Sequence, residues 1–202
     1  MDSTGAIASS IRAACADLDL PVPSIEQASH IIGLGLTEAI AELLPELPVT
    51  DYAHFTDRYR HHFLGQDHLL SLFDGVAQTI PELQQSGYWV TVATGKSRRG
   101  LERALDQSRL RPYFHASRCA DEVFSKPHPG MILELMDYCG VSPARTLMIG
   151  DTSHDLQMAQ NAGVASVGVG YGAHSGTSLQ VFDPLYVADD FAGLTRWLSR
   201  HG

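Results

Sequence analysis

The segment 149–155 places two carboxylates where a short apolar run ends. It reads Ile-Gly-Asp-Thr-Ser-His-Asp, so Asp151 and Asp155 are four positions apart at the expected start of a helix. Residues at this spacing can lie on one side of a helix, so both acids can face the same pocket. Two carboxylates without a neighbouring arginine suit a hard cation such as Mg²⁺, which prefers oxygen ligands. The alternative is structural, because aspartate at a helix N-terminus commonly acts as a cap.

Two further segments carry groups that could bind an oxyanion. Thr94 and Gly95 follow the apolar run 88–93. A hydroxyl and backbone amides at such a turn can donate hydrogen bonds to phosphate. Lys126 stands directly before Pro127, and its ammonium could offset the charge of a phosphoryl group beside carboxylates. Each signal is weak by itself, because Thr-Gly turns are common and a loop lysine is usually solvated.

From about residue 73 the sequence alternates short β-branched runs with amphipathic stretches. Strands are predicted at 88–93, 114–116, 146–149, 166–169 and 186–187, and helices at 98–107, 129–139, 153–162 and 191–200. This alternation predicts an α/β fold with an open, doubly wound parallel sheet covered by helices on both faces. Ligands of such sheets bind beyond the carboxyl ends of the strands. We therefore expect Thr94, Lys126 and Asp151, each near a predicted strand end, to share one site.

Residues 6–70 follow a helical rhythm instead. Apolar residues recur at three- and four-residue spacing over 6–18 and 32–44, and another helical stretch covers 52–64. Ser24, with Gln27 three positions later, predicts a capping box at a further helix start. The sequence thus predicts a helical domain at 6–70 and an α/β core domain formed by 1–5 and 71–202.

Composition and charge exclude several classes of protein. The 202 residues are 44% hydrophobic and 18% charged, as in ordinary globular domains. The balance of 14 basic and 23 acidic residues gives a net charge of −9, so we expect no nucleic-acid and no membrane partner. No apolar run approaches the roughly 20 residues of a transmembrane helix, and no signal-peptide pattern is visible. Cys15, Cys119 and Cys139 form no motif, which predicts reduced thiols and a cytoplasmic location.

The order Thr-Gly, Lys-Pro and Gly-Asp-x-x-x-Asp resembles the haloacid dehalogenase (HAD) superfamily, specifically its phosphoglycolate phosphatase-like branch with a helical cap. The resemblance extends over essentially the whole chain. It implies Mg²⁺-dependent hydrolysis of a small phosphorylated metabolite through an aspartyl-phosphate, in a monomer or homodimer. It also implies catalytic roles for Thr94, Lys126 and Asp151: Thr94, Gly95 and Lys126 would bind the phosphoryl oxygens, and Asp151 would bind Mg²⁺. Asp155 would not bind the ion directly but would lie next to Asp151 or contact metal-bound water.

The family's first motif, an apolar strand ending in Asp-x-Asp-Gly-Thr, does not occur in these 202 residues. Its first aspartate is the nucleophile in the family, and residues 1–5 resemble the segment that follows it. The pair Asp17 and Asp19 is no substitute, because no strand precedes it and Leu20-Pro21 follows; we expect it at the end of a helix. The resemblance therefore implies a sheet that lacks its central first strand and a chain that is catalytically inactive.

Other functions remain open from the residues alone. A dehalogenase or a sugar-phosphate mutase would share the fold, although paired acids favour metal-assisted phosphate chemistry over dehalogenation. A non-catalytic protein that binds phosphate is the alternative from another class. A response-regulator receiver also combines a lysine with acids, but the long helical region argues against it.

Several other residues receive structural interpretations. The segment Gly33–Gly35 is not a dinucleotide loop, because it follows a helix and lacks a third glycine; the family resemblance implies that it faces the active site. His154 and His128 are expected at solvent-facing or loop positions. The basic run 58–62, Arg98 and Arg99 are expected on solvated helix faces, although Arg98 and Arg99 could also approach a substrate carboxylate.

Overall fold

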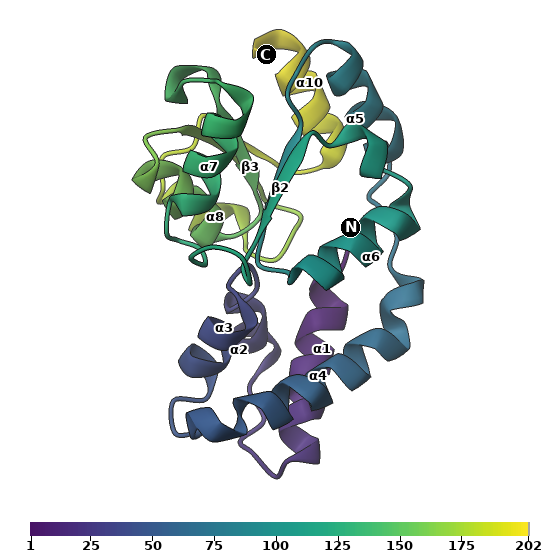
Figure 1. Cartoon of the computed structure of the whole chain (residues 1–202), viewed down its shortest axis with the longest axis vertical. Coiled ribbons are helices and arrows are strands. Elements are labelled where there is room, and N and C mark those ends of the chain that lie inside the picture. Colours follow the sequence, from purple (N-terminus) through teal and green to yellow (C-terminus); the bar gives the residue numbers. More distant parts are fainter. Residues whose placement is uncertain (202) are drawn as a thin grey trace.

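Four amphipathic helices form the first part of the chain, in the lower half of Figure 1. The computed structural model describes residues 1–201, so Gly202, the last residue of the expected core domain, lies outside the description. The elements are α1 (Thr4–Asp17), α2 (Ile25–His30), α3 (Leu36–Leu43), η1 (Val49–Asp51), α4 (Tyr52–Gln66) and η2 (Asp67–Leu69). Their apolar faces share one core that contains Ile11, Ile40 and Phe55, each no more than 2% exposed.

Local sequence explains where two of these helices begin. The predicted capping box is present at α2: Ser24 Oγ accepts from Gln27 N–H at 3.1 Å, and Gln27 Oε1 accepts from Ser24 N–H at 2.9 Å. The helix expected over 32–44 begins only at Leu36. Gly33 has a φ of +102°, a left-handed conformation that a right-handed helix cannot contain, so the chain turns there before α3 starts.

The second part of the chain contains five parallel strands in two separate sheets, surrounded by the remaining helices (Figure 1). The strands are β1 (Thr91–Thr94), β2 (Ala116–Cys119), β3 (Leu147–Gly150), β4 (Ala165–Val169) and β5 (Tyr186–Ala188). The helices are α5 (Val76–Gln85), α6 (Arg98–Ser108), η3 (Arg111–Tyr113), α7 (Gly130–Cys139), η4 (Pro143–Arg145), α8 (Ser153–Asn161), α9 (Gly176–Gln180) and α10 (Phe191–His201). The doubly wound α/β class is as predicted.

The predicted strand bounds are wrong in two places. β1 begins at Thr91 rather than at residue 88, because its pairing with β2 begins at the Thr91–Ala116 pair. β2 lies at 116–119 rather than at 114–116, because its pairing with β1 runs from Ala116 to Cys119. Helix α5, which contains Pro81, and the five-residue α9 were not predicted.

The two sheets have the orders β1–β2 and β3–β4–β5, so β1 and β3 each keep one edge without a strand partner within residues 1–201. Ile149 of β3 is 37% exposed, unusually open for a parallel strand. Helices α7 and α8 nevertheless cover both sheets, since Ala93 of β1 and Met148 of β3 pack against the same buried cluster. The helical layer, rather than strand pairing, joins the sheets.

None of the helices in the described part of the chain combines the length and apolar character that crossing a membrane requires.

Candidate active site

The predicted lysine forms a buried ion pair with one of the predicted aspartates. Lys126 Nζ lies 2.5 Å from Asp155 Oδ1, and the two side chains are only 6% and 4% exposed. The other carboxylate oxygen, Asp155 Oδ2, accepts from the Thr152 N–H at 3.1 Å and from the Thr152 hydroxyl at 2.7 Å. Asp155 therefore has both oxygens engaged and fixes the position of the ammonium. The alternative of a solvated loop lysine is wrong.

At the start of α8, Asp155 both takes part in the helix cap and contacts Lys126. Thr152 is the N-cap residue, and its Oγ1 accepts from the Asp155 N–H at 3.2 Å, which completes a capping box with Asp155. Asp151 is thus not the cap. Lys126 itself lies in the loop between β2 and α7, several residues after β2 ends, and not directly at a strand end as the sequence suggested.

Asp151 follows the last residue of β3 and is oriented by the loop after β4. Its Oδ2 accepts from the Ala173 N–H at 2.9 Å, and its main-chain oxygen accepts from the His174 N–H at 3.0 Å. Its Oδ1 accepts no hydrogen bond from the residues that the structure describes. Asp151 is half-buried, so this oxygen remains available to a ligand.

Thr94 is the last residue of β1, and its hydroxyl can donate a hydrogen bond to a ligand. The Lys96 N–H donates to Thr94 Oγ1 at 3.1 Å, so the hydroxyl hydrogen of Thr94 is left for another acceptor. Gly95 follows, and the space around it excludes any side chain. A methyl group at this position would overlap the carbonyl oxygens of Gly33 and Leu34, which approach it from the helical part.

The loop Gly33–Gly35 contacts three segments of the α/β part. The Gly35 N–H donates to Ser125 Oγ at 2.7 Å. A Cβ built on Gly33 would lie 2.7 Å from Thr152 Oγ1, and the third contact is with Gly95. Each of these three core residues directly adjoins one of the predicted site residues.

Thr94, Lys126 and Asp151 are far apart in the chain, but each directly adjoins a residue that contacts this one loop. Figure 1 shows the same junction, with the loop between α2 and α3 touching the end of the α/β part near the strand termini. The arrangement offers a hydroxyl, backbone amides, an ammonium and one carboxylate oxygen to a ligand at this junction.

A cluster of three histidines joins the two parts of the chain beside Asp151. The Nε2 atoms of His154 and His174 each lie 3.0 Å from the main-chain oxygen of His30, at the end of α2. His174 Nδ1 accepts from the Ser153 N–H at 3.0 Å, so Nε2 carries the proton and donates to His30. Burial lowers the pKa of His174 and the neighbouring His154 lowers it further, while the hydrogen bond to the His30 carbonyl opposes this shift. The expectation that His154 faces solvent is wrong, because the helical part covers it.

The donors around Asp151 supply only part of a metal site. Within residues 1–201, no three histidine, cysteine, aspartate or glutamate side chains come together as metal ligands. Asp155 is committed to Lys126 and Thr152, which leaves Asp151 Oδ1. Mg²⁺ commonly takes one or two carboxylates and fills its remaining positions with water and substrate oxygens. Asp151 therefore fits one ligand position, and the residues present do not complete the site.

The remaining acidic and basic candidates have structural partners. Arg58 Nη2 and His62 Nε2 lie 2.9 and 2.8 Å from Asp17 Oδ2, so they link α4 to the end of α1. The Asp17 and Asp19 pair thus ends a helix, as predicted. Arg98 binds Glu122 at 2.7 Å and belongs to a network on the core surface rather than to the site.

Two other residues are also excluded from chemistry by their contacts. His128 Nδ1 accepts from the Gly130 N–H at 3.1 Å, a local turn contact as expected. Cys119 is fully buried, and burial raises its pKa to about 11, so it is a packed side chain and not a nucleophile.

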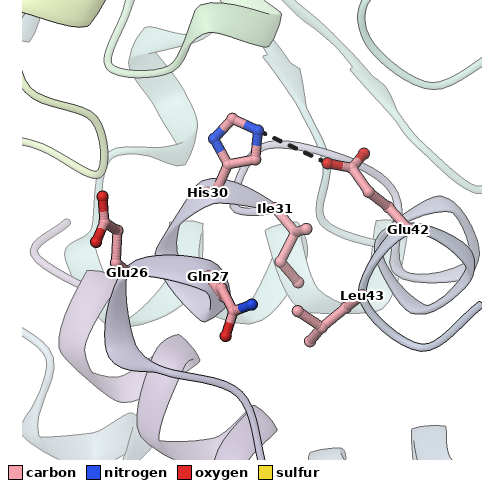
Figure 2. A pocket seen from close by; sticks show the side chains of 6 residues that line it. All are labelled: Glu26, Gln27, His30, Ile31, Glu42 and Leu43. Atoms are coloured by element: carbon pink, nitrogen blue, oxygen red, sulfur yellow. Dashed lines mark ion pairs between the residues drawn. The ribbon is translucent and has the colours of Figure 1, made fainter.

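A pocket of about 350 Å³ lies on the helical part, between α2 and α3 (Figure 2). Its walls come from α2 and α3, and His30 Nε2 lies 3.7 Å from Glu42 Oε1 across it. It is lined by Glu26, Gln27, His30, Ile31, Glu42 and Leu43. None of the predicted site residues lines this pocket, so it is not the predicted phosphate site.

Thr152 was not predicted; the loop 170–174 was expected to rim the pocket at a strand end, but its hydrogen bonds from the Ala173 and His174 amides to Asp151 were not. A signal for Thr152 exists in the sequence, because Thr-x-x-Asp before an apolar stretch is a capping-box pattern. Nothing in the sequence pairs the loop at 173 and 174 with Asp151, because that contact depends on how β4 lies beside β3.

Comparison with known proteins identifies the family. Residues 1–169 match the family model described as haloacid dehalogenase-like hydrolase. The chain is 34% identical over 199 residues to the probable phosphatase IndB of Dickeya dadantii, covering 95% of this chain and 86% of that protein. It is 30% identical over 204 residues to the phosphoglycolate phosphatase of Agrobacterium fabrum, covering 96% and 86%.

Solved structures agree on the fold. The crystal structure of a hydrolase from Pseudomonas syringae superimposes with a TM-score of 0.91 at 18% identity, over all of this chain and 94% of the other. The family model matches most of the sequence, and a probable phosphatase aligns with 95% of this chain. The chain therefore belongs to the haloacid dehalogenase-like hydrolases.

Proposed function

We propose that the junction around the loop Gly33–Gly35 binds the phosphate of a small phosphate monoester, and that the protein derives from Mg²⁺-dependent phosphatases of the phosphoglycolate phosphatase type. The observation that carries this proposal is the contact of one loop with Gly95, Ser125 and Thr152, which gathers Thr94, Lys126 and Asp151. The phosphatase and phosphoglycolate phosphatase relatives support the same substrate class.

Each residue has a distinct role in this proposal. The Thr94 hydroxyl and the Gly95 amide donate to phosphoryl oxygens, and the Lys126 ammonium offsets their charge. Asp155 is a positioning residue, because it holds Lys126 through a 2.5 Å ion pair. Asp151 Oδ1 is the direct Mg²⁺ ligand. When bound, the ion would help neutralise the charge of the phosphoryl group.

We also propose that the helical domain, residues 6–70, is a cap over this site. Its loop donates the Gly35 N–H to Ser125, and the His30 carbonyl accepts from two core histidines. A substrate bound beneath these contacts would be shielded from water, as closed active sites require. The cap would therefore help to choose which phosphate ester enters.

We propose that the acids of the junction bind the ester and its ion and do not attack phosphorus. Hydrolysis in this family needs a carboxylate aimed at phosphorus, whereas Asp155 is engaged by Lys126 and Thr152, Asp151 Oδ2 accepts from Ala173, and Asp151 Oδ1 is assigned to Mg²⁺. Asp2 is exposed, and only its N–H is anchored, to the Ser71 main-chain oxygen at 2.9 Å. The acids of the junction therefore account for binding of the phosphate and not for its hydrolysis. Turnover of p-nitrophenyl phosphate with Mg²⁺ that Asp151→Ala abolishes would contradict this view.

Isothermal titration calorimetry with 2-phosphoglycolate and Mg²⁺ tests the binding site directly. Thr94→Val removes a hydroxyl that donates to the phosphate, and we expect about a tenfold loss of affinity, which corresponds to about 1.4 kcal/mol. Thr195→Val is the matched control, since the Thr195 hydroxyl donates only to the Ala192 main-chain oxygen in exposed α10. Equal affinity in both variants would overturn the proposed site.

A further inference from the structure

The chain contains only two lysines, Lys96 and Lys126, among 14 basic residues. Lys126 is the buried lysine of the junction. Lys96 stands two residues after Thr94, and its main chain is fixed on both sides. Its N–H donates to Thr94 Oγ1 at 3.1 Å, and its carbonyl oxygen accepts from the Ala120 N–H at 3.2 Å. Both lysines are thus anchored beside the proposed phosphate site, whereas every other cationic side chain is an arginine or a histidine.

The two lysines differ in how their charge is compensated. Lys126 has a carboxylate at 2.5 Å. Lys96 is half-buried, and no carboxylate oxygen of residues 1–201 lies within 4.0 Å of its Nζ. Its ammonium lies over the ring of Phe63, at 5.3 Å from the centroid. A cation–π contact offsets part of the cost of removing an ammonium from water, but an ion pair offsets more.

The two carboxylates that act electrostatically on Lys96 are oriented by other partners. Burial lowers the pKa of Lys96, and Asp67 and Asp151 act against that effect. Asp67 Oδ2 is bound by Arg103 Nε at 2.8 Å and by Gln107 Nε2 at 3.3 Å. Asp151 Oδ2 accepts from the Ala173 amide. Lys96 is therefore a fixed, partly desolvated cation without a counter-ion of its own.

We propose that Lys96 binds a second anionic group of the substrate, a carboxylate or a second phosphate, while the first phosphate lies at Thr94 and Lys126. This inference rests on the proposed function and narrows its substrate class to small phosphate esters with two anionic ends. A substrate anion would supply the missing counter-ion through charge-assisted hydrogen bonds. Lysine suits this role because its ammonium is a compact charge with three donors, which need not match a planar partner.

The position of Phe63 links this selectivity to the helical domain. Phe63 belongs to α4, while Lys96 belongs to the turn after β1. The surroundings of the ammonium are thus built by both domains together. An ester with a single anionic group has no second group to bind Lys96. We therefore expect it to lack the Lys96 contact whether or not the helical domain packs on the core.

Calorimetric titrations in Mg²⁺ buffer with 2-phosphoglycolate and with methyl phosphate test the inference. Lys96→Met should lower the affinity for phosphoglycolate about tenfold and leave the affinity for methyl phosphate within twofold of the unsubstituted chain. Lys96→Arg should retain most of the phosphoglycolate affinity. Arg99→Met is the control, because Arg99 is an exposed cation at the start of the same helix, α6. An unchanged thermal midpoint or a higher one in Lys96→Met shows that folding is not the cause of a loss.

The outcomes separate this inference from the proposed function. Equal losses for both ligands, or no loss for either, would overturn the role of Lys96 and leave the phosphate site standing. Failure of the unsubstituted chain to bind methyl phosphate or phosphoglycolate would overturn the proposed function and this inference with it. A [¹⁵N]lysine spectrum gives a second readout, since it contains only two side-chain signals. Phosphoglycolate should shift the signal that Lys96→Arg removes, and methyl phosphate should not; the absence of such a shift contradicts the contact.

Discussion

The two sheets of the α/β part differ in burial, although each supplies part of the site. In the β3–β4–β5 sheet, Val167 and Ala188 are 0% exposed. In the β1–β2 sheet, every residue of β1 is half-buried. Parallel strands are ordinarily covered on both faces and paired at both edges when they lie inside a sheet. Asp151 therefore follows a strand that pairs with the buried strand β4, whereas Thr94 ends a strand of a two-stranded sheet; β3 and β1 each keep one unpaired edge among the described residues.

The contrast shows that the site depends on contacts that cross between the sheets. Lys126 lies in the loop after β2, and its partner Asp155 lies in α8, directly after β3. The core under α7 and α8 crosses the same boundary through Ala93 and Met148. Strand pairing holds each sheet together, whereas the ion pair and the packing of α7 and α8 hold the two sheets against each other.

The largest effect is expected from breaking the ion pair between the sheets. Lys126→Met leaves the Asp155 carboxylate buried beside Thr152 without its cation, and we expect a loss of about 3–5 kcal/mol in the free energy of unfolding. Urea denaturation followed by circular dichroism measures it. In the double variant Lys126→Met with Asp155→Asn no unpaired charge remains, so its loss should be clearly smaller. A single-variant loss below about 1 kcal/mol would mean that the pair does not join the sheets.

A pair of valine substitutions sharpens the comparison of burial. Val167→Ala in β4 removes fully buried methyl groups and should cost about 2 kcal/mol of unfolding free energy. Val92→Ala in β1 makes the same chemical change at a half-buried position and should cost about half as much. Each variant is the other's control in the same urea titration. Equal losses would show that β1 is as firmly packed as β4.

The smallest effect concerns pH and the histidines that tie the helical domain to the β3 side. Burial holds the pKa of His174 below its ordinary value of 6.5, so the unfolded chain binds this proton more readily than the folded chain. The free energy of unfolding should therefore fall as the pH drops below about 6.5, by at most about 1.4 kcal/mol per pH unit from this group.

Urea titrations between pH 7.5 and about 5.5 measure this dependence, and His174→Gln should flatten it. His128→Gln, in a local turn, is the control that should leave it unchanged. A pH dependence that survives in His174→Gln would assign the effect to other groups.

Local signals in the sequence predicted most elements of the fold. The capping box at Ser24 and the helix that begins at Ser153 lie where residue patterns place them, and the strand predicted at 146–149 lies one residue later, at 147–150. The shifted start of β1 has a non-local cause, because only its partner β2 defines where the pairing begins. Helix α5 went unpredicted, since the proline at position 81 disguises its helical pattern.

Candidate site residues were predicted by type, and their contacts were not. The sequence singled out Thr94, Lys126, Asp151 and Asp155 as groups suited to phosphate and a cation. Their roles stay predictions until the binding experiments are done. Which acid would pair with Lys126 and which would keep a free oxygen depends on atoms that are brought together only by folding.

Sequence by itself determined the α/β class, the helical region and the set of polar groups, because periodicity and side-chain chemistry are local properties. Tertiary structure alone decided that one loop of the helical region touches three core segments, that the strands divide into two sheets, and that Lys96 lacks a counter-ion where Lys126 has one. These facts depend on distances between residues remote in the chain, and no local pattern encodes such distances.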